Sequence, residues 1–378
     1  MIYLDNAATT FPKPNRVISE VQNCLKCYSA NPGRGGHKLA LSASERVYSC
    51  RRKCAEFFGA KSIENVVFTS SCTAAINTVL KGVLKSGDHV VCSSFEHNAV
   101  IRPLEALKKR GVSYDVARVF PYDDIATINA FEALIRRETK LIICTHASNV
   151  FGFVLPIEKL SKLCKEYDIL FAVDAAQSAG VLPINCERYG IDFLCVAPHK
   201  GLYAPMGTGI LIANSEIDNA LIEGGTGSYS ALLDQPDVLP DKFESGTLNL
   251  VGIVGIEAGL DFVKHRRPER IYMDEIGLIK KCYSNLIRYK HIELYSEAPE
   301  LGRAVPVLSF NVKGIHSEKI GEQLDRLGIA SRAGLHCAPI AHKTMGTLNS
   351  GTVRIAPSAF TKDFEIDYFI NKIKFLKK

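Results

Sequence analysis

The chain has 378 residues and a formal net charge of +6; 47% of its residues are hydrophobic and 23% are charged. This composition is typical of a globular protein, and the length predicts one large domain with a smaller one. The small net charge and the short basic clusters give no reason to expect a nucleic-acid surface. No run of about 20 apolar residues indicates a membrane helix, and the opening MIYLDNAATT does not resemble an export signal.

Twelve cysteines in such a chain are expected to be free, mostly buried thiols in a reducing, cytoplasmic compartment. Two pairs imitate the spacing of zinc ligands: Cys24 with Cys27, and Cys50 with Cys54. The surrounding segments, 16–28 and 39–58, have helical patterns, and this spacing places each pair on one helix face. Buried thiols are therefore favoured over a metal site, and no metal is expected.

From residue 65 to 213, short apolar runs alternate with helical patterns. The strand-like runs are Val66–Thr69, His89–Cys92, Leu141–Thr145, Leu170–Val173, Phe193–Val196 and Gly209–Ile212. The clearest helical patterns between them are Ala74–Lys85, Val100–Arg110 and Ile157–Lys165. Such alternation predicts an α/β domain whose mainly parallel sheet is covered by helices and gathers ligands beyond its strand ends.

The second half of the chain changes to an α+β pattern. Its expected elements are helices at Val251–Arg266, Glu269–Arg288 and Ser317–Leu327, strands at Val305–Val312 and Thr352–Ile355, a loop at Ser331–Pro339 and a last helix from Lys362. We therefore expect a large domain at residues 15–255. A small domain at 256–378 would include the N-terminal segment 1–14, with the boundary near the helix that begins at Val251.

Two residues suit a single cofactor. Lys200 follows a strand-like run and a proline, where an unprotonated amine would reach an aldehyde at the sheet edge. Asp174 closes the apolar strand of LFAVDAAQSAG, where its carboxylate would pair with a protonated pyridine nitrogen. The plainer alternatives are an exposed loop lysine, and a helix cap or magnesium ligand for Asp174.

Two further segments follow strand ends. Ser70–Ala75 offers small and hydroxyl residues at a helix N-terminus, which suits a phosphate. The same residues are equally typical of an ordinary helix cap. No Walker-type GxxxxGK sequence occurs, so a nucleoside triphosphate is disfavoured. His97, in SSFEHNAV, would stack on a planar ring and relay protons, or would be a hydrogen-bonded loop histidine.

The segment SRAGLHCAP carries a cysteine among cationic neighbours. Cys337 follows His336 and lies near Arg332, and such neighbours favour the reactive thiolate. Arg354, in GTVRIAP, would join Arg332 near a carboxylate substrate, because guanidinium binds carboxylate in a bidentate fork.

Together these motifs resemble the cysteine desulfurases among the class-V aminotransferase-like, fold-type I enzymes that use pyridoxal 5'-phosphate. The resemblance spans nearly the whole chain, from YLDNAATT to GTVRIAPSAF, and is strongest at VDAAQSAG, HKGLYAPMGTG, ESGTLN and RAGLHCAP. The RxGxHCA form is similar to the second group of these enzymes, which includes selenocysteine-lyase-like members.

The resemblance implies a set of cofactor-binding positions: Cys72, Thr73, His97, Asp174, Gln177, His199, Lys200 and Thr247. Lys200 is the lysine bonded to the cofactor, Asp174 the partner of the ring nitrogen, and Gln177 a contact of the phenolic oxygen. Thr73 and His199 hold the phosphate, and Thr247 reaches the phosphate of the neighbouring subunit in a homodimer.

The substrate side is implied in the same way. Asn149, Arg332 and Arg354 match substrate-binding positions, with Arg354 as the main carboxylate clamp, and His37 lies in a segment that resembles the entrance. Lys200, His97 and Cys337 are the implied catalytic residues. Lys200 takes the α-proton of L-cysteine, and Cys337 attacks the substrate sulfur, keeps it as a persulfide and leaves alanine.

The chain also departs from this pattern. Ala197 replaces a phosphate-binding serine, and Cys72 replaces a threonine, which puts cofactor affinity in question more than reaction type. Alternatives on the same fold are a selenocysteine lyase acting on L-selenocysteine, and an aminotransferase or epimerase, which would need no Cys337. A non-catalytic sulfur carrier or regulator would not need both Lys200 and Cys337. The sequence does not identify the sulfur-acceptor protein.

Overall fold

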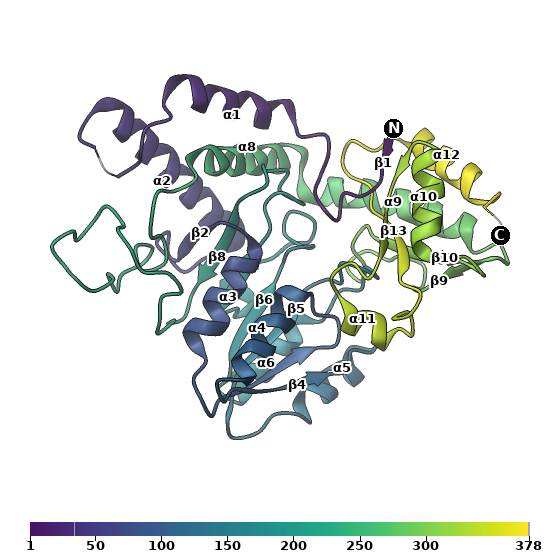
Figure 1. The fold of residues 1–378 in the computed structure, drawn as a ribbon, viewed down its shortest axis with the longest axis horizontal. Coiled ribbons are helices and arrows are strands. Elements are labelled where there is room, and N and C mark those ends of the chain that lie inside the picture. The colour runs from purple at the N-terminus through teal and green to yellow at the C-terminus, as the bar shows by residue number, and fades with distance from the viewer. Residues whose placement is uncertain (34, 377–378) are drawn as a thin grey trace.

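A computed structural model describes residues 1–33 and 35–376. A large unit built around a central sheet occupies one side of the molecule, and a smaller unit that contains both chain termini occupies the other (Figure 1).

The central sheet is mainly parallel, as the alternation predicted. Its strand order is β2-β8-β7-β6-β5-β3-β4. The strands are β2 (Val66–Thr69), β3 (His89–Ser93), β4 (Ser113–Ala117), β5 (Thr139–Thr145), β6 (Leu170–Asp174), β7 (Phe193–Val196) and β8 (Gly209–Ala213). The strands from β4 to β7 pair in parallel, whereas β8 runs antiparallel to both β7 and β2.

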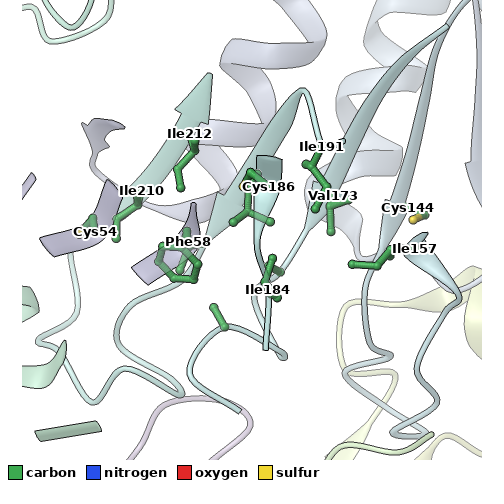
Figure 2. Close-up of a cluster of buried hydrophobic side chains, with 14 of the residues drawn as sticks. Cys54, Phe58, Cys144, Ile157, Val173, Ile184, Cys186, Ile191, Ile210 and Ile212 are labelled. Carbon is green, nitrogen blue, oxygen red and sulfur yellow. The ribbon is translucent and has the colours of Figure 1, made fainter. Parts of the chain in front are cut away.

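Helices cover both faces of this sheet. They are α1 (Asn15–Cys27), α2 (Lys38–Phe58), α3 (Cys72–Val83), α4 (Asn98–Lys108), α5 (Asp124–Glu132), α6 (Ile157–Glu166), α7 (Cys186–Tyr189) and α8 (Leu250–Arg266). Successive strand residues enter opposite cores: on β5, Ile142 and Cys144 belong to one buried cluster, and Leu141 and Ile143 to the other. Figure 2 shows part of the first cluster, where Val173 of β6 lies among isoleucines from neighbouring elements.

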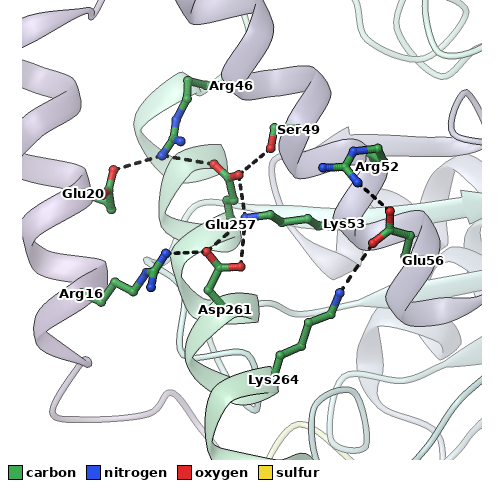
Figure 3. Close-up of polar contacts among 10 residues, drawn as sticks. All are labelled: Arg16, Glu20, Arg46, Ser49, Arg52, Lys53, Glu56, Glu257, Asp261 and Lys264. Atoms are coloured by element: carbon green, nitrogen blue, oxygen red, sulfur yellow. Dashed lines mark hydrogen bonds and ion pairs between the residues drawn. The ribbon is translucent and has the colours of Figure 1, made fainter.

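A charged network fastens α8 to α1 and α2 (Figure 3). Glu257 of α8 is buried, accepts a hydrogen bond from the Ser49 hydroxyl at 2.7 Å, and pairs with Arg46 at 3.2 Å and Lys53 at 2.9 Å. Asp261, one turn further, also pairs with Lys53 at 2.9 Å. A buried carboxylate needs such partners, so the network fixes how these three helices pack.

The smaller unit contains a four-stranded antiparallel sheet and a two-stranded one. The first has the order β12-β13-β10-β9, and the second pairs β1 with β11 in parallel. The strands are β1 (Ile2–Tyr3), β9 (Ile292–Leu294), β10 (Leu308–Val312), β11 (Ile329–Ala330), β12 (Arg332–Gly334) and β13 (Thr352–Ile355). The helices are α9 (Pro268–Leu286), α10 (Ser317–Arg326), α11 (Pro339–Thr344) and α12 (Asp363–Ile373).

One expectation was wrong in this unit: residues 331–339 are not simply a loop. Arg332–Gly334 forms β12, because these residues pair antiparallel with β13. The helix α11 then begins at Pro339, whose fixed φ suits the first helical position.

All twelve cysteines are free thiols, and every one except Cys27 and Cys337 is buried. The expectation of mostly buried thiols is confirmed, although Cys24 and Cys27 differ in burial despite sharing a helix. Within residues 1–33 and 35–376, no group of three or more His, Cys, Asp or Glu side chains is arranged to hold a metal ion. No described helix is long and apolar enough to cross a membrane.

A buried ion pair ties α2 to β2 and to the segment before α8, and it yields a prediction. Arg51 binds both carboxylate oxygens of Glu244, at 2.7 and 2.8 Å, and Glu244 also accepts the Phe68 N–H at 2.7 Å. Changing Glu244→Gln leaves the buried guanidinium without its counter-charge. We expect the free energy of unfolding in urea to fall by about 3 kcal/mol.

The exposed Arg52–Glu56 pair of the same helix, at 2.8 Å, supplies the control. Glu56→Gln is expected to change the free energy of unfolding by less than about 0.5 kcal/mol, because water screens this pair. Equal losses in the two variants would contradict the structural role of the Arg51–Glu244 pair.

Candidate active site

The carboxyl ends of four neighbouring strands deliver candidate residues to one edge of the central sheet. Asp174 is the last residue of β6, and Lys200 follows β7 by four positions. His97 follows β3, and Asn149 follows β5, in the same way. Parallel strands end at a common edge, so segments far apart in the sequence converge there, as the sequence predicted.

Asp174 is only 4% exposed and is held by neighbours on both sides of the strand end. Its Oδ1 accepts the Ala176 N–H at 2.9 Å and the Cys72 thiol at 3.6 Å. Burial, and then the charge of Asp174, raises the pKa of the Cys72 thiol well above its ordinary value, so Cys72 stays protonated and donates. Cys72, which was expected at a cofactor-binding position, has its sulfur against this carboxylate.

The Lys200 amine has no hydrogen bond or ion pair with any residue that the structure describes. Burial lowers its pKa, and the Asp174 carboxylate opposes that effect. The guanidinium groups of Arg354 and Arg332 lower it further. Lys200 is therefore biased toward the neutral, nucleophilic amine that bonds to an aldehyde.

His97 caps the N-terminus of α4. Its Nδ1 accepts the Ala99 N–H at 3.0 Å, which leaves the ring proton on Nε2. Burial lowers the pKa of His97, Asp174 raises it and Lys200 lowers it again. The imidazole is accordingly a neutral hydrogen-bond donor at the sheet edge.

The first turn of α3 and His199 offer free donors to an anion. Ser71 caps α3 by accepting the Ala74 N–H at 3.1 Å, while Thr73 is exposed in the first helical turn, whose amides have no partner inside the helix. The His199 Nδ1 is buried without a partner among the described residues. Burial, assisted by the charge of Lys200, lowers the pKa of His199 to about 4.

The exposed Cys337 sits on a turn that is tied to the large unit. The Arg332 guanidinium lies 3.7 Å from its sulfur, and the Asn98 N–H donates to its carbonyl at 2.7 Å. The side chain of Asn149 donates to the carbonyl of His336 at 2.8 Å. These contacts bring the cysteine turn, α4 and the segment after β5 together.

Arg354 is 1% exposed and already has two partners. Its Nη2 binds Asp5 at 2.7 Å, and its Nη1 donates to the Asn149 carbonyl at 2.8 Å. Its Nε is buried and unpartnered among the described residues. Arg354 also faces Arg332 in the β12–β13 register. A substrate carboxylate bound by Arg354 would therefore share the guanidinium with Asp5.

The remaining predicted residues lie in different places. Gln177 lines a pocket with Lys200 and donates to the Ala7 carbonyl at 2.9 Å. Thr247 is exposed and lines another pocket, beside the start of α3. His37 caps α2 and is exposed; helix α2 lies on the opposite side of the molecule from α11 (Figure 1). The structure does not bring His37 to the other candidates within one chain.

Two acidic residues of the site were missed in the sequence. Asp5 lies within the YLDNAATT motif, but its partner Arg354 is remote in the chain. Glu96 is fully buried, and its Oε1 accepts the Thr145 N–H at 2.8 Å and the Ser93 hydroxyl. Burial, opposed by these hydrogen bonds and supported by the nearby Asp174 charge, raises the pKa of Glu96 to about 8. Its position beside His97 was the only available signal.

Comparison with known proteins agrees with this geometry. The family described as "Aminotransferase class-V" matches residues 2–369. A probable cysteine desulfurase of Methanothermobacter thermautotrophicus is 32% identical over 375 residues, covering 97% of this chain and 92% of the relative. A probable cysteine desulfurase of Borreliella burgdorferi is 32% identical over 388 residues, covering 99% and 91%.

Solved structures show the same similarity. The apo structure of the cysteine desulfurase from Thermococcus onnurineus NA1 superposes with a TM-score of 0.90 at 30% identity, covering 99% of this chain and 94% of that one. The fold and the residues at its strand ends define a fold-type I enzyme of the pyridoxal-phosphate class. The chain belongs to the class-V aminotransferase family.

The electrostatics of the site predict a shift in the reactivity of Lys200. Because the Asp174 carboxylate raises the pKa of Lys200, Asp174→Asn should lower it further. In cofactor-free protein, the pH midpoint for labelling Lys200 with trinitrobenzenesulfonate should fall by roughly one pH unit, as read by peptide mass spectrometry. Asp192→Asn, at the opposite end of β7, is the control that should leave the midpoint in place. If the pH midpoint for labelling Lys200 were the same in Asp174→Asn as in the wild type, the proposed electrostatic coupling between Asp174 and Lys200 would be wrong.

Proposed function

We propose that this chain is a pyridoxal-phosphate-dependent cysteine desulfurase, which converts L-cysteine to L-alanine and retains the sulfur on Cys337 as a persulfide. One observation carries the proposal: an exposed thiol, 3.7 Å from the Arg332 guanidinium, is tied by Asn98 and Asn149 to the strand ends that present Lys200. The family and the names of the relatives support the same activity.

The residues present fit the cofactor. Among the residues that the structure describes, the buried Lys200 amine has no polar partner, and the second oxygen of the buried Asp174 carboxylate has none either. His199 has an orphaned Nδ1, and Thr73 begins a helix, so both suit the phosphate. We assign His97 and Gln177 to the ring. When bound, pyridoxal phosphate supplies an electron sink for negative charge at the substrate Cα.

The protein groups then have distinct tasks. Asp174 supplies a fixed negative charge at the end of β6, where a protonated ring nitrogen would be stabilised. The Lys200 amine, whose pKa burial lowers, takes the proton from Cα. The neutral His97 holds a proton on Nε2 at the same edge. Asn149, Arg332 and Arg354 provide the substrate side, with two guanidinium groups for one carboxylate.

Cys337 performs the sulfur step. Its thiolate attacks the sulfur of the substrate, so that an S–S bond forms while the substrate Cβ–S bond breaks and Cβ gains a proton. The balance is L-cysteine plus the enzyme thiol giving L-alanine plus the enzyme persulfide. The Arg332 guanidinium stabilises negative charge on the attacking sulfur. Because Cys337 is exposed, a sulfur-acceptor protein has access to the persulfide.

We also propose a homodimer, in which Thr247 reaches the partner's phosphate site and His37 borders the partner's entrance. Exposed apolar side chains support an interface on this side of the molecule, away from the smaller unit (Figure 1): Ile18 and Leu25 on α1, Leu39 and Leu41 on α2, and Leu232 and Leu233 before α8. The free thiols support a cytoplasmic location.

The division into residues 15–255 and 256–378 remains our proposal for the domains. Pairing of β1 with β11 supports joining residues 1–14 to the smaller unit. The proposed boundary falls inside α8, whose Leu250–Leu260 half packs in the main core, so α8 is the element that both units share.

The central test separates cofactor binding from sulfur transfer. Cys337→Ser should still bind pyridoxal phosphate and still show a spectral change with L-cysteine, because neither event uses the thiol. Alanine release should fall at least about 100-fold, and no persulfide should be found by mass spectrometry. The other exposed cysteine supplies the control, since Cys27→Ser should match the wild type. Undiminished alanine release by Cys337→Ser would sink the proposed role.

The dimer is tested on its apolar surface. Leu25→Asp combined with Leu233→Asp should place charges in the interface, giving a monomer by light scattering and at least about 10-fold lower activity. Phe364→Asp is the matched control, because Phe364 is 69% exposed on α12 of the smaller unit. If the double variant or Phe364→Asp were a fully active monomer, an active site shared between two chains would be ruled out.

A further inference from the structure

The turn that carries Cys337 has an unfavourable backbone. His336 and Cys337 are consecutive residues with φ of 51° and 57°, in the left-handed region that side-chain-bearing residues avoid. Such a conformation persists only where the surroundings fix it. Some of the fixing contacts come from backbone and amide groups, including the Ala338 N–H to the Leu335 carbonyl at 2.9 Å. The rest come from two imidazole rings.

His336 links the turn to Arg332. Its Nε2 lies 3.2 Å from the Arg332 carbonyl, which only accepts, so Nε2 carries the proton and donates. The ring is stacked on that of His342, with centroids 5.7 Å apart and planes 13° apart. The Arg332 guanidinium reaches the Cys337 sulfur. The stacked His336 ring therefore helps to hold both Cys337, its neighbour in the chain, and Arg332, which supplies the positive charge.

His342, on α11, is held in place by several contacts, so its ring is a fixed stacking partner for His336. It is 0% exposed, and its Nδ1 lies 2.8 Å from the Thr347 hydroxyl. The ring also meets the Phe151 ring edge-on at 5.5 Å, and Phe151 belongs to the main core of the large unit. His342 is therefore held from α11, from the segment after it and from the opposite unit at once.

Both rings remain neutral in this arrangement. Burial, supported by the charge of Arg354, lowers the pKa of His336 to about 2, and burial lowers that of His342 to about 4. The His336 Nδ1 and the His342 Nε2 are buried and without partners among the described residues. Two charged rings would repel each other at this spacing, so neutrality permits the stack.

We propose that His342 is a positioning residue for sulfur transfer: its ring, stacked on His336, holds the Cys337 thiol beside Arg332. This rests on the proposed role of Cys337. His342 touches neither substrate nor cofactor and acts only through the turn. The proposal accounts for a fully buried imidazole in α11 that the reaction itself does not use.

The test replaces the planar imidazole of His342 with side chains that still fill its space. His342→Leu lacks the stack, His342→Phe restores a plane, and Thr347→Val releases the Nδ1 contact as an independent milder change. His89→Leu is the matched control, because His89 is also 0% exposed and its Nδ1 lies 2.8 Å from a threonine hydroxyl, that of Thr139. His89 begins β3, at the end of the sheet remote from the site.

Two readouts are measured on the purified holoenzymes. The first is the rate of Cys337 alkylation by iodoacetamide relative to Cys27, the other exposed cysteine, obtained by peptide mass spectrometry. The second is the single-turnover rate of persulfide formation, together with the spectral dissociation constant for L-cysteine. If His342 had only a structural role, its replacement would lower the melting temperature without changing the relative alkylation rate or the rate of persulfide formation.

In His342→Leu we expect the relative alkylation of Cys337 to fall about five-fold and persulfide formation to slow about ten-fold, with L-cysteine binding unchanged. His342→Phe should recover most of both, and Thr347→Val should lie between. His89→Leu should keep wild-type values. Wild-type values in His342→Leu and Thr347→Val, or equal losses in His89→Leu, would overturn the proposal. If the wild type formed no persulfide, the proposed function would fail instead, and the alkylation ratio would still decide whether His342 positions the thiol.

Discussion

Burial and the Asp174 carboxylate at the end of β6 together shift the pKa values of the groups around this carboxylate. Asp174 is taken out of water, and its Oδ1 is satisfied by an N–H and an S–H, which leaves charge at the strand end for a cation to neutralise. Burial, supported by the nearby Asp174 charge, raises the pKa of Glu96 to about 8. Lys200 is balanced between burial and attraction to Asp174. The pKa shifts in the site therefore combine the burial of each group with its interaction with Asp174.

The two units contribute different halves of the chemistry. Strand ends of the large unit hold the groups that suit a cofactor, whereas β12, β13 and the turn before α11 hold a thiol and two guanidinium groups. The Asn98 N–H and the Asn149 amide cross between the units, and both end on carbonyls of the cysteine turn. Reactivity at sulfur therefore depends on how the smaller unit packs against the large one, through these contacts and through α11, where His342 meets Phe151 of the main core.

Local patterns predicted the strands and helices well, because alternation and helical periodicity are properties of contiguous residues; β2, β5 and β13 begin and end close to where the patterns placed them. The short strand β12 was expected to be loop, since three residues become a strand only through a partner found later in the chain. The same limit applies to Arg354: its motif indicated a guanidinium near substrate, but not that Asp5 already binds it. Cys72 matched a cofactor-binding position, but the sequence did not indicate that its sulfur lies against Asp174, because a residue's type does not fix the direction of its side chain. The proposed roles of His37 and Thr247 depend on the proposed second chain, which one sequence does not place.

Residues 1–14 connect parts of the molecule that are far apart in the sequence. Strand β1 needs β11 as its partner, and the hydroxyls of Thr9 and Thr10 donate to the His199 carbonyl, at the lysine turn, at 3.1 Å each. Strand β1 cannot pair until the chain as far as β11 has been made, and contacts of such long sequence separation form slowly. Thr9 and Thr10, which support the lysine turn, thus lie on a segment that β11 anchors to the smaller unit, so the placement of this segment couples that unit to the proposed lysine site.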